Sequence, residues 1–327
     1  MSIIVLRTGV ADTIQDGGRF GYQHLGINPS GAMDLNAMKI VNALVGNQLN
    51  DAVIEMSFPA SAFQFTKPAI IALGGGDFSA MLNEEDVPLH RSLVVPAGSQ
   101  LKFSKLLKGA WGYLAVAGGF SLPAWLGSNS TNLKAKAGGV DGRSLKKQDE
   151  IGFRQIPIKT NKALVSSWSV NISEFYFKEG LIRCIQGHEF EWLTKQSQSD
   201  FQEKKFALST QCDRMGYRLK GNLLTQRKKQ ELLSTAVNFG TIQLLPNGEL
   251  IILMADHQTT GGYPRVAHVI TADRSTLAQM RPNEKISFQF ITLEQAEELA
   301  IKQTQSLQQL QAACKYNLAE LVRKIAI

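Results

Sequence analysis

The chain has 327 residues, of which 44% are hydrophobic and 19% charged, so it can bury a large core and general intrinsic disorder is excluded. The formal net charge is +7 at pH 7, but Lys and Arg are scattered, and no basic run interleaved with aromatic residues indicates nucleic-acid binding. Three cysteines without paired spacing, no apolar run of membrane-span length and no signal-peptide pattern predict a cytoplasmic protein.

The first half of the chain combines many short apolar runs with a single helical pattern. Residues 3–6 predict a strand, and glycines with Pro29 predict a long loop over residues 14–34. Apolar residues then recur at helical spacing over residues 33–45, with Asp34 placed to cap the helix start and Gly46 to end it. The remaining runs predict closely spaced strands.

The second half repeats the strand-rich pattern and ends differently. Residues 156–173 carry no clear periodicity and predict a connection between domains, after which strand-like runs resume at residue 181. From Leu293 onward, apolar residues fall near one helical face with Gln and Glu on the other. This pattern predicts a C-terminal helical tail, which we interpret as a pair of surface helices.

Similar blocks recur in the same order in the two halves. The pair Gly21-Tyr22 corresponds to Gly216-Tyr217 at an offset of 195, and Arg91-Ser92 corresponds to Arg274-Ser275 at an offset of 183. Matching blocks at a slowly drifting offset indicate an internal duplication. The sequence therefore predicts a mainly β chain with two tandem β domains, at residues 1–160 and 161–290, and a helical tail at residues 291–327.

Residues 256–265, DHQTTGGYPR, form the most unusual segment of the chain. They follow a strand pattern and combine hydrogen-bonding side chains with two glycines and a proline, which suits a binding loop on a rigid sheet. An ordinary hairpin connection is the alternative. The candidate binding residues are Gln258, Thr259, Gly261, Gly262 and Tyr263, and the candidate catalytic residues are Asp256 and Thr260.

A glycine run in the first half occupies the corresponding place in the duplication. Gly74, Gly75, Gly76 and Asp77 follow a strand pattern, and they are predicted to break it with a turn. A second strand pattern follows them, whereas a phosphate-binding loop requires a helix start. Gly75 and Gly76 remain candidates for close approach to a ligand, and Asp77 remains a candidate base.

Two further groups of polar residues are candidates for substrate binding. Gln15, Asp16 and Arg19 lie in the long N-terminal loop, and Arg214 follows Asp213 in the second half. An arginine in such a place can grip a carboxylate with two hydrogen bonds, or it can form an ion pair that braces a turn. The five histidines show no metal-binding spacing, and no metal site is predicted.

Five ordered blocks resemble the KipA / allophanate hydrolase subunit 2 family, and the resemblance extends from about residue 5 to about residue 290. This family includes the C subunit of 5-oxoprolinase, and its members are similar to biotin-dependent carboxyltransferases. The five blocks are residues 13–34, 113–120, 126–131, 213–221 and 255–265. The resemblance implies that the two β domains are cyclophilin-like β-barrels. The internal duplication separately sets residues 74–77 of the first half opposite residues 256–262 of the second, and we expect these two glycine segments to meet at a cleft.

The resemblance further implies one subunit of an ATP-dependent 5-oxoprolinase, which cleaves 5-oxo-L-proline to L-glutamate. Two partner subunits are then expected, one KipI-like and one LamB/YcsF-like, with ATP as a co-substrate whose site the partners share. We expect the chain to be inactive alone. Two alternatives stay open: the carboxyltransferase component of a biotin-dependent urea or amide carboxylase, and a non-enzymatic, KipA-like antagonist of a kinase inhibitor.

Overall fold

The computed structural model describes residues 1–154, 158, 160–176, 180–228, 230 and 232–325. Two compact units divide the chain: Met1–Arg19, Asp34–Ile172 and Gln305–Ile327 form the first, and Phe20–Met33 with Ser173–Thr304 form the second. The segment Phe20–Met33 thus belongs with the C-terminal half. Ile156, Pro157 and Lys159 of the predicted connection lie outside the described residues. The predicted domain ranges 1–160, 161–290 and 291–327 stay a prediction.

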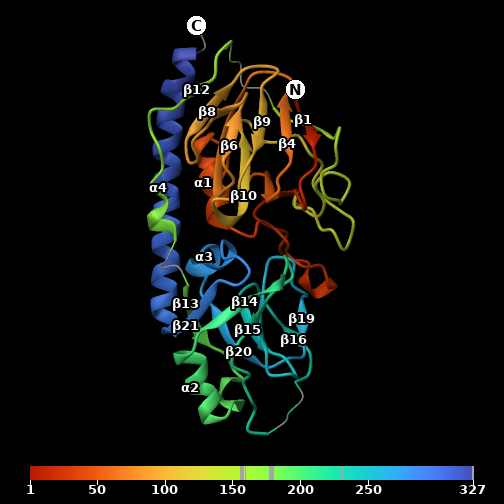
Figure 1. Cartoon of the computed structure of the whole chain (residues 1–327), viewed down its shortest axis with the longest axis vertical. Coiled ribbons are helices and arrows are strands. Elements are labelled where there is room, and N and C mark those ends of the chain that lie inside the picture. Colours follow the sequence, from red (N-terminus) through yellow and green to blue (C-terminus); the bar gives the residue numbers. More distant parts are fainter. Residues whose placement is uncertain (155–157, 159, 177–179, 229, 231, 326–327) are drawn as a thin grey trace. The chain divides into compact units, whose positions relative to one another are not determined.

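The first unit is built from two six-stranded sheets, whose paired strands are all antiparallel (Figure 1). One sheet has the order β11-β1-β4-β9-β6-β7, and the other has the order β12-β8-β5-β10-β3-β2. The strands are β1 (Ser2–Arg7), β2 (Thr13–Gln15), β3 (Val53–Ser57), β4 (Ala62–Phe65), β5 (Ala69–Asp77), β6 (Ala80–Leu82), β7 (Glu85–Asp86), β8 (Ser92–Val95), β9 (Gln100–Phe103), β10 (Lys108–Val116), β11 (Glu150–Gly152) and β12 (Leu164–Val165).

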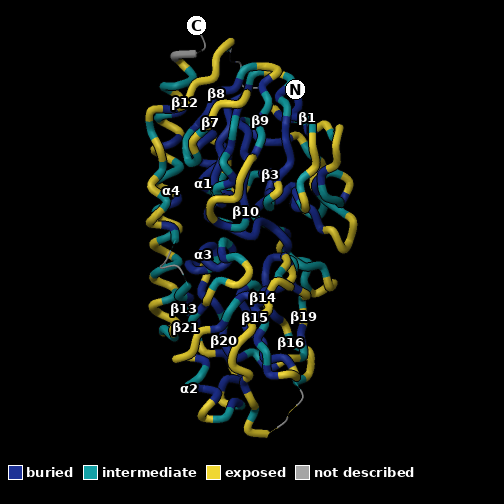
Figure 2. Tube along the Cα trace, in the orientation of Figure 1, coloured by how far each residue is buried: buried dark blue, intermediate teal, exposed yellow. Residues whose placement is uncertain are grey.

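One hydrophobic core lies between these two sheets. Ile3 and Phe63 contribute from one sheet, and Ile54, Ile71 and Leu114 contribute from the other, all fully buried. Most positions of β3, β5, β8 and β10 are buried, which agrees with the closely spaced apolar runs in the sequence. Figure 2 shows the buried strands surrounded by exposed loops.

Helix α1 (Leu35–Leu44) packs on β5 and β10 and has the predicted ends. The Asp34 carboxylate accepts a hydrogen bond from the Ala37 N–H at 2.9 Å, and Gly46, just beyond the last turn, has a φ of 73°. A side chain at Gly74 would lie 2.7 Å from Val41 of the helix, so the glycine allows helix and sheet to approach closely.

The predicted break at residues 74–77 is wrong, because β5 continues through Asp77. A Cβ at Gly75 would lie 2.4 Å from the Trp111 carbonyl oxygen of β10. A Cβ at Gly76 would lie 2.9 Å from the Phe78 ring. These glycines give the neighbouring strand and the aromatic ring the space that a side chain would fill.

The second unit contains a closed seven-stranded barrel with the order β13-β20-β17-β18-β15-β14-β21, which a parallel β13–β21 pair completes. Phe201 of helix α2 (Lys195–Glu203) stacks on Phe288 at a ring-centroid distance of 4.8 Å and anchors that helix to the barrel. The strands are β13 (Leu181–Gln186), β14 (Phe206–Cys212), β15 (Gly216–Lys220), β17 (Thr241–Leu244), β18 (Leu250–Leu253), β20 (Arg265–Val269) and β21 (Lys285–Phe290). Outside the barrel, β16 (Thr235–Ala236) pairs with β19 (Thr260–Gly261), and the helices are η1 (Gln23–Leu25), η2 (Ile172–Phe175), η3 (Phe190–Trp192), α2 (Lys195–Glu203), η4 (Thr271–Asp273) and α3 (Arg274–Ala278).

The C-terminal tail is one helix, α4 (Leu293–Ile325), so the predicted pair of helices is wrong. No glycine or proline interrupts its 33 residues, which is why it continues unbroken. Within the second unit Gln303 donates to the Ala272 carbonyl, and within the first unit Gln311 donates to the Asn47 carbonyl. Among the described residues, no helix has the length and apolar character needed to cross a membrane. The predicted mainly β chain with a C-terminal helical tail is confirmed.

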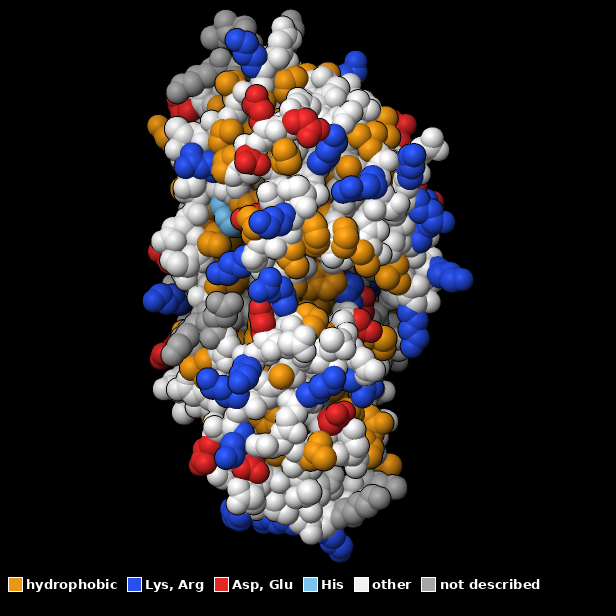
Figure 3. All heavy atoms as spheres, viewed as in Figure 1, with side chains coloured by type: hydrophobic (Ala, Val, Ile, Leu, Met, Phe, Trp, Pro, Cys, Tyr) orange, Lys and Arg blue, Asp and Glu red, His pale blue; other side chains and the backbone are white. Residues whose placement is uncertain are grey.

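The positive charge of the chain is spread over its surface. In the face drawn in Figure 3, Lys and Arg side chains lie singly and in small groups among acidic and uncharged side chains. On this face they form no continuous basic patch of the kind that follows a nucleic-acid backbone. The scatter seen in the sequence therefore persists on the folded surface that this view shows.

Candidate functional site

The loop at residues 256–265 leaves the barrel at the end of β18 and returns to it at β20. Its backbone is fixed at several points: the Asp256 N–H donates to the Arg214 carbonyl at 2.7 Å, and the His257 N–H donates to the Met254 carbonyl at 3.1 Å. Farther along, the Val237 N–H donates to the Thr259 carbonyl, and Thr260–Gly261 pairs with β16. The loop backbone is therefore held by the barrel and by β16, which agrees with the predicted loop on a rigid sheet, and its role in binding stays a prediction.

An arginine–carboxylate pair holds the first residue of this loop. Arg214 donates from Nε to Asp256 Oδ2 at 2.8 Å and from Nη2 to Asp256 Oδ1 at 3.0 Å. The Ser30 hydroxyl donates to the same carboxylate at 2.6 Å, and Arg214 Nη2 also donates to the Gly31 carbonyl at 2.7 Å. The side chains of Arg214 and Asp256 are only 8% and 15% exposed, so solvent weakens their attraction little. The cluster ties the segment at residues 20–33 to the loop.

A buried glutamine supports the far end of the loop. Gln243, on β17, is fully buried and donates from Nε2 to the Tyr263 carbonyl at 3.4 Å. A Cβ at Gly261 would lie 2.6 Å from the same Nε2, so the glycine gives the amide its place. Gln243 Oε1 has no hydrogen-bond partner among the described residues, and the Thr235 hydroxyl in β16 has none either. Buried polar atoms without a hydrogen-bond partner are uncommon in folded proteins.

The loop divides its side chains between the interior and the surface. Gln258, Thr260 and Tyr263 are exposed, whereas His257 is 2% exposed. The His257 ring contacts the Gln258 carbonyl through Nδ1 at 2.5 Å. Burial lowers the pKa of His257, and the positive charge of Arg274 adds to this effect. The ring is therefore neutral at neutral pH. Since it is buried, His257 supports the loop from the interior, whereas Gln258, Thr260 and Tyr263 face solvent.

In the first unit, Asp16 and Arg19 both organise the loop at residues 125–130. Asp16 accepts from the Asn129 N–H at 2.6 Å and from the Ser128 and Ser130 hydroxyls at 2.8 and 2.5 Å. Arg19 donates to the carbonyls of Trp125 and Ser130, and its guanidinium lies 4.3 Å from the centre of the Trp125 ring. These contacts account for the burial of both side chains.

Gln15, Gly75, Gly76 and Asp77 also belong to the first unit. Gln15 donates to the Thr13 hydroxyl and the Thr131 carbonyl, while its Oε1 is buried without a partner among the described residues. Asp77 accepts from the Ser79 N–H at 2.9 Å. The expected meeting of the two glycine segments at a cleft stays a prediction, as do the ligand-binding and catalytic roles of these residues.

The residues at 74–77 do not fit a nucleotide phosphate. Their glycines face the Trp111 carbonyl and the Phe78 ring, and they lie within a strand. A phosphate loop instead presents backbone N–H groups at the start of a helix. This segment therefore does not present a phosphate-binding loop to ATP.

Sequence analysis missed two residues that support the loop, Ser30 and Gln243, and only Gln243 carries a recognisable signal in the sequence. Ser30 lies among loop residues, and only its contact with Asp256, 226 positions away, distinguishes it. Gln243 carries a signal, because a glutamine in the middle of an apolar strand pattern is unusual. The structure joins Arg214 to the 256–265 loop, whereas the other candidates belong to the first unit: Gln15, Asp16, Arg19, Gly75, Gly76 and Asp77.

The sequence of residues 25–290 matches the family described as carboxyltransferase domain, subdomain A and B. The chain belongs to this family. It is 38% identical over 292 residues to the C subunit of 5-oxoprolinase from Escherichia coli, which covers 89% of this chain and 92% of that protein. It is 37% identical over 298 residues to the C subunit of 5-oxoprolinase from Haemophilus influenzae, which covers 91% of this chain and 94% of that protein.

A solved structure shares the fold of this family member. The crystal structure of the Kluyveromyces lactis urea amidolyase matches 94% of this chain with a TM-score of 0.86 and 24% sequence identity. The match covers 20% of that much longer chain. The shared architecture confirms the fold expected for the family.

Proposed function

We propose that the chain is a subunit of an ATP-dependent 5-oxoprolinase that converts 5-oxo-L-proline to L-glutamate. The observation that carries the proposal is the similarity, over nearly their full lengths, to two proteins named as the C subunit of 5-oxoprolinase. Two partners complete the enzyme in this proposal, one KipI-like and one LamB/YcsF-like. The chain is inactive alone, and the complex works in the cytoplasm.

The substrate presents two groups for recognition, a carboxylate and a lactam amide. When the ring opens, water adds to the lactam carbonyl carbon, the C–N bond breaks, and the nitrogen leaves as the amine of glutamate. Negative charge develops on the carbonyl oxygen before the bond breaks, so fixed hydrogen-bond donors there accelerate the reaction. The Gln258 amide and the Thr260 hydroxyl are exposed and are able to donate hydrogen bonds to a ligand. We assign them, with Thr259 and the N–H groups of Gly261 and Gly262, to binding the lactam, and Tyr263 to covering it.

The Arg214–Asp256 pair and Ser30 serve this site as positioning residues in the proposal. The Asp256 oxygens already accept three hydrogen bonds, from Arg214 Nε, Arg214 Nη2 and Ser30. A carboxylate that accepts these three hydrogen bonds holds the start of the loop in place. It is also less able to take a proton from water, because its oxygens are already occupied. Action of Asp256 or Asp77 as the base stays an alternative. D256N and D77N, assayed in the complex, test these roles. Replacing the base would lower kcat and remove its ionisation from the pH dependence of kcat, whereas replacing a positioning residue would lower kcat and leave that ionisation in place.

ATP is a co-substrate of the complex in this proposal, and the partner subunits supply most of its site. The glycine run at residues 74–77 lies inside a strand and offers no helix start to a phosphate.

The test is glutamate and ADP release by the co-expressed three-subunit complex, compared with each component by itself. We expect turnover only when all three are present. We expect Q258A and T260V to lower kcat/KM by about 100-fold, the effect of losing one donor to a developing oxyanion. Q211A, which removes an exposed glutamine on β14, is the matched control and keeps full activity. Normal turnover in both loop variants would contradict the assignment of the loop.

A biotin-dependent carboxyltransferase is the second candidate, because the family is described by that transfer reaction. Under this alternative the chain acts on urea or a related amide, and biotin is carried on another chain. Activity that needs bicarbonate and is blocked by avidin would favour it. Avidin-resistant release of glutamate favours the oxoprolinase.

A further inference from the structure

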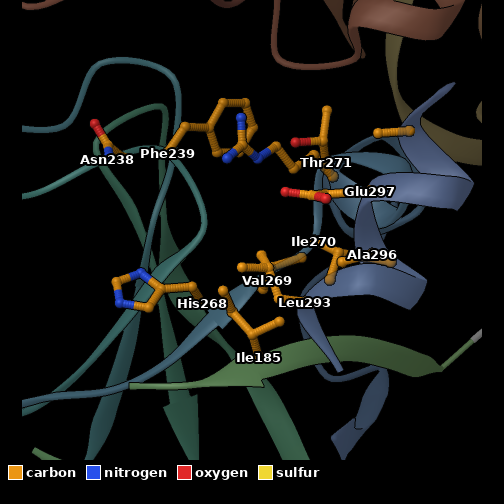
Figure 4. Close-up of a pocket in the computed structure, with 12 residues that line it drawn as sticks. Ile185, Asn238, Phe239, His268, Val269, Ile270, Thr271, Leu293, Ala296 and Glu297 are labelled. Carbon is orange, nitrogen blue, oxygen red and sulfur yellow. The ribbon is translucent and has the colours of Figure 1, made fainter. Parts of the chain in front are cut away.

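The second unit carries a pocket of about 410 Å³ beside the barrel, formed by strands, a loop and the start of α4. This volume lies within the range of about 300–1,000 Å³ typical of small-molecule sites. Figure 4 shows Ile185, Val269 and Leu293 meeting at its base, and the Glu297 carboxylate projecting into it from α4. The lining residues are Ile185, Asn238, Phe239, His268, Val269, Ile270, Thr271, Arg274, Leu293, Ala296, Glu297 and Ala300.

Arg274 is the exceptional residue of this pocket. Its guanidinium lies over the Phe239 ring, 5.2 Å from the ring centre, and its Nε is buried without a hydrogen-bond partner among the described residues. Burial lowers the pKa of Arg274 to about 10, so the group is still positively charged at neutral pH. A Cβ at Gly240 would lie 3.4 Å from Nε, so the glycine leaves this face of the guanidinium little obstructed.

The other inward-lying arginines of this unit have carboxylate partners. Arg183 pairs with Asp273 at 2.5 Å, Arg214 with Asp256 at 2.8 Å, and Arg265 with Glu189 at 2.8 Å. Arg274 has no carboxylate within 4 Å in the part of the chain that the structure describes. Burying the Nε of a cation without a hydrogen-bond partner is costly, which makes an external anion the simplest explanation.

We propose that this pocket is a second ligand site, which binds a small organic monocarboxylate with an apolar body. The carboxylate would accept hydrogen bonds from the Arg274 guanidinium, and the body would lie on the apolar side chains of Ile185, Val269 and Leu293. Glu297 stands in the same pocket and repels a second negative group. None of the lining residues belongs to the loop at 256–265, so the inference does not rest on the proposed function.

Binding of hexanoate, adipate and hexylammonium to the full-length chain tests the proposal. We expect hexanoate to bind by isothermal titration and to shift the His268 ring signals in NMR spectra. Adipate has the same length with two carboxylates and should bind at least fivefold more weakly, and hexylammonium should not bind. R274M should weaken the binding affinity for hexanoate at least tenfold. R218M, at an exposed arginine of β15, should leave this affinity unchanged. E297Q should reduce the difference in binding affinity between hexanoate and adipate, because it removes the negative charge that repels the second carboxylate.

R274M could lose binding because it misfolds, so a second variant blocks the pocket and keeps Arg274. A296F puts a phenyl ring into the pocket from α4 and should abolish binding while Arg274 stays charged. Equal hexanoate affinity in wild type, R274M and A296F would overturn the proposal, as would ligand-induced shifts confined to another surface. Activity of the assembled complex is not used, so failure here and failure of the oxoprolinase proposal are distinguishable.

Discussion

Arg214 and Asp256 are joined three times: two side-chain hydrogen bonds of 2.8 and 3.0 Å link guanidinium to carboxylate, and the Asp256 N–H donates to the Arg214 carbonyl at 2.7 Å. The residues are 42 positions apart and come from the turn before β15 and the turn after β18. The pair fixes the strand ends from which the candidate loop starts. Side-chain and main-chain contacts thus reinforce each other.

We expect R214K to destabilise the protein by about 1–3 kcal/mol, because lysine carries the charge but not the planar fork that makes two bonds. Both side chains are mostly buried, so we expect a larger loss of stability than for an ion pair on the surface. Urea unfolding measures the change. R218K on the exposed face of β15 is the control and should be nearly neutral. Identical midpoints for R214K and wild type would contradict the positioning role.

We expect G261A to destabilise the protein by about 1–3 kcal/mol, because the added methyl meets Gln243 Nε2 at 2.6 Å. Combining it with Q243A should recover part of this loss, since the amide that clashes is removed. A double-mutant cycle from thermal or urea unfolding measures the coupling. G152A, where the nearest atom would lie at 3.7 Å, is the matched control. Strictly additive effects would show that the two residues do not interact.

Asp12 predicts a pH dependence of stability. Burial raises its pKa from 3.8 to about 6, against the opposing hydrogen bonds from Ser61 and Ser57. The folded state therefore holds a proton that the unfolded chain releases between about pH 4 and 6, so this carboxyl lowers stability as pH rises through that window. The shift corresponds to about 3 kcal/mol at most.

The comparison of wild type with D12N isolates this effect. We expect the free energy of unfolding of wild type, relative to D12N, to fall between pH 4 and pH 7 by up to about 3 kcal/mol. D86N, at an exposed position of β7, should keep the wild-type pH profile. A constant difference between wild type and D12N across this range would show that Asp12 titrates normally.

We expect D16N to destabilise the first unit by about 2–4 kcal/mol, because an amide cannot accept all the hydrogen bonds that Ser128, Asn129 and Ser130 donate. Limited proteolysis and urea unfolding measure the loss, with D141N at an exposed position as control. In the assembled complex, a structural role predicts that kcat falls with the fraction folded while KM is unchanged. A rise in KM for 5-oxoproline in the folded fraction would favour direct substrate binding by Asp16.

Local sequence determined those features whose interactions lie within a few residues. The Asp34 cap and Gly46 stop defined α1, because capping joins residues three or four positions apart. The strand-rich composition and the ordered loop at residues 256–265 followed from short-range patterns in the same way. The absence of a helix start after Gly76 already argued against a phosphate loop.

Only the tertiary structure decided which distant residues meet. Gly74 and Gly75 looked like a turn but serve close packing against Val41 and the Trp111 carbonyl, which no local pattern encodes. Ser30 reaches Asp256 across 226 positions, and Arg274 is exceptional because the carboxylate of the adjacent Asp273 is held by an arginine elsewhere in the barrel. Backbone propensities act over a few residues, whereas burial and charge pairing depend on the folded chain as a whole.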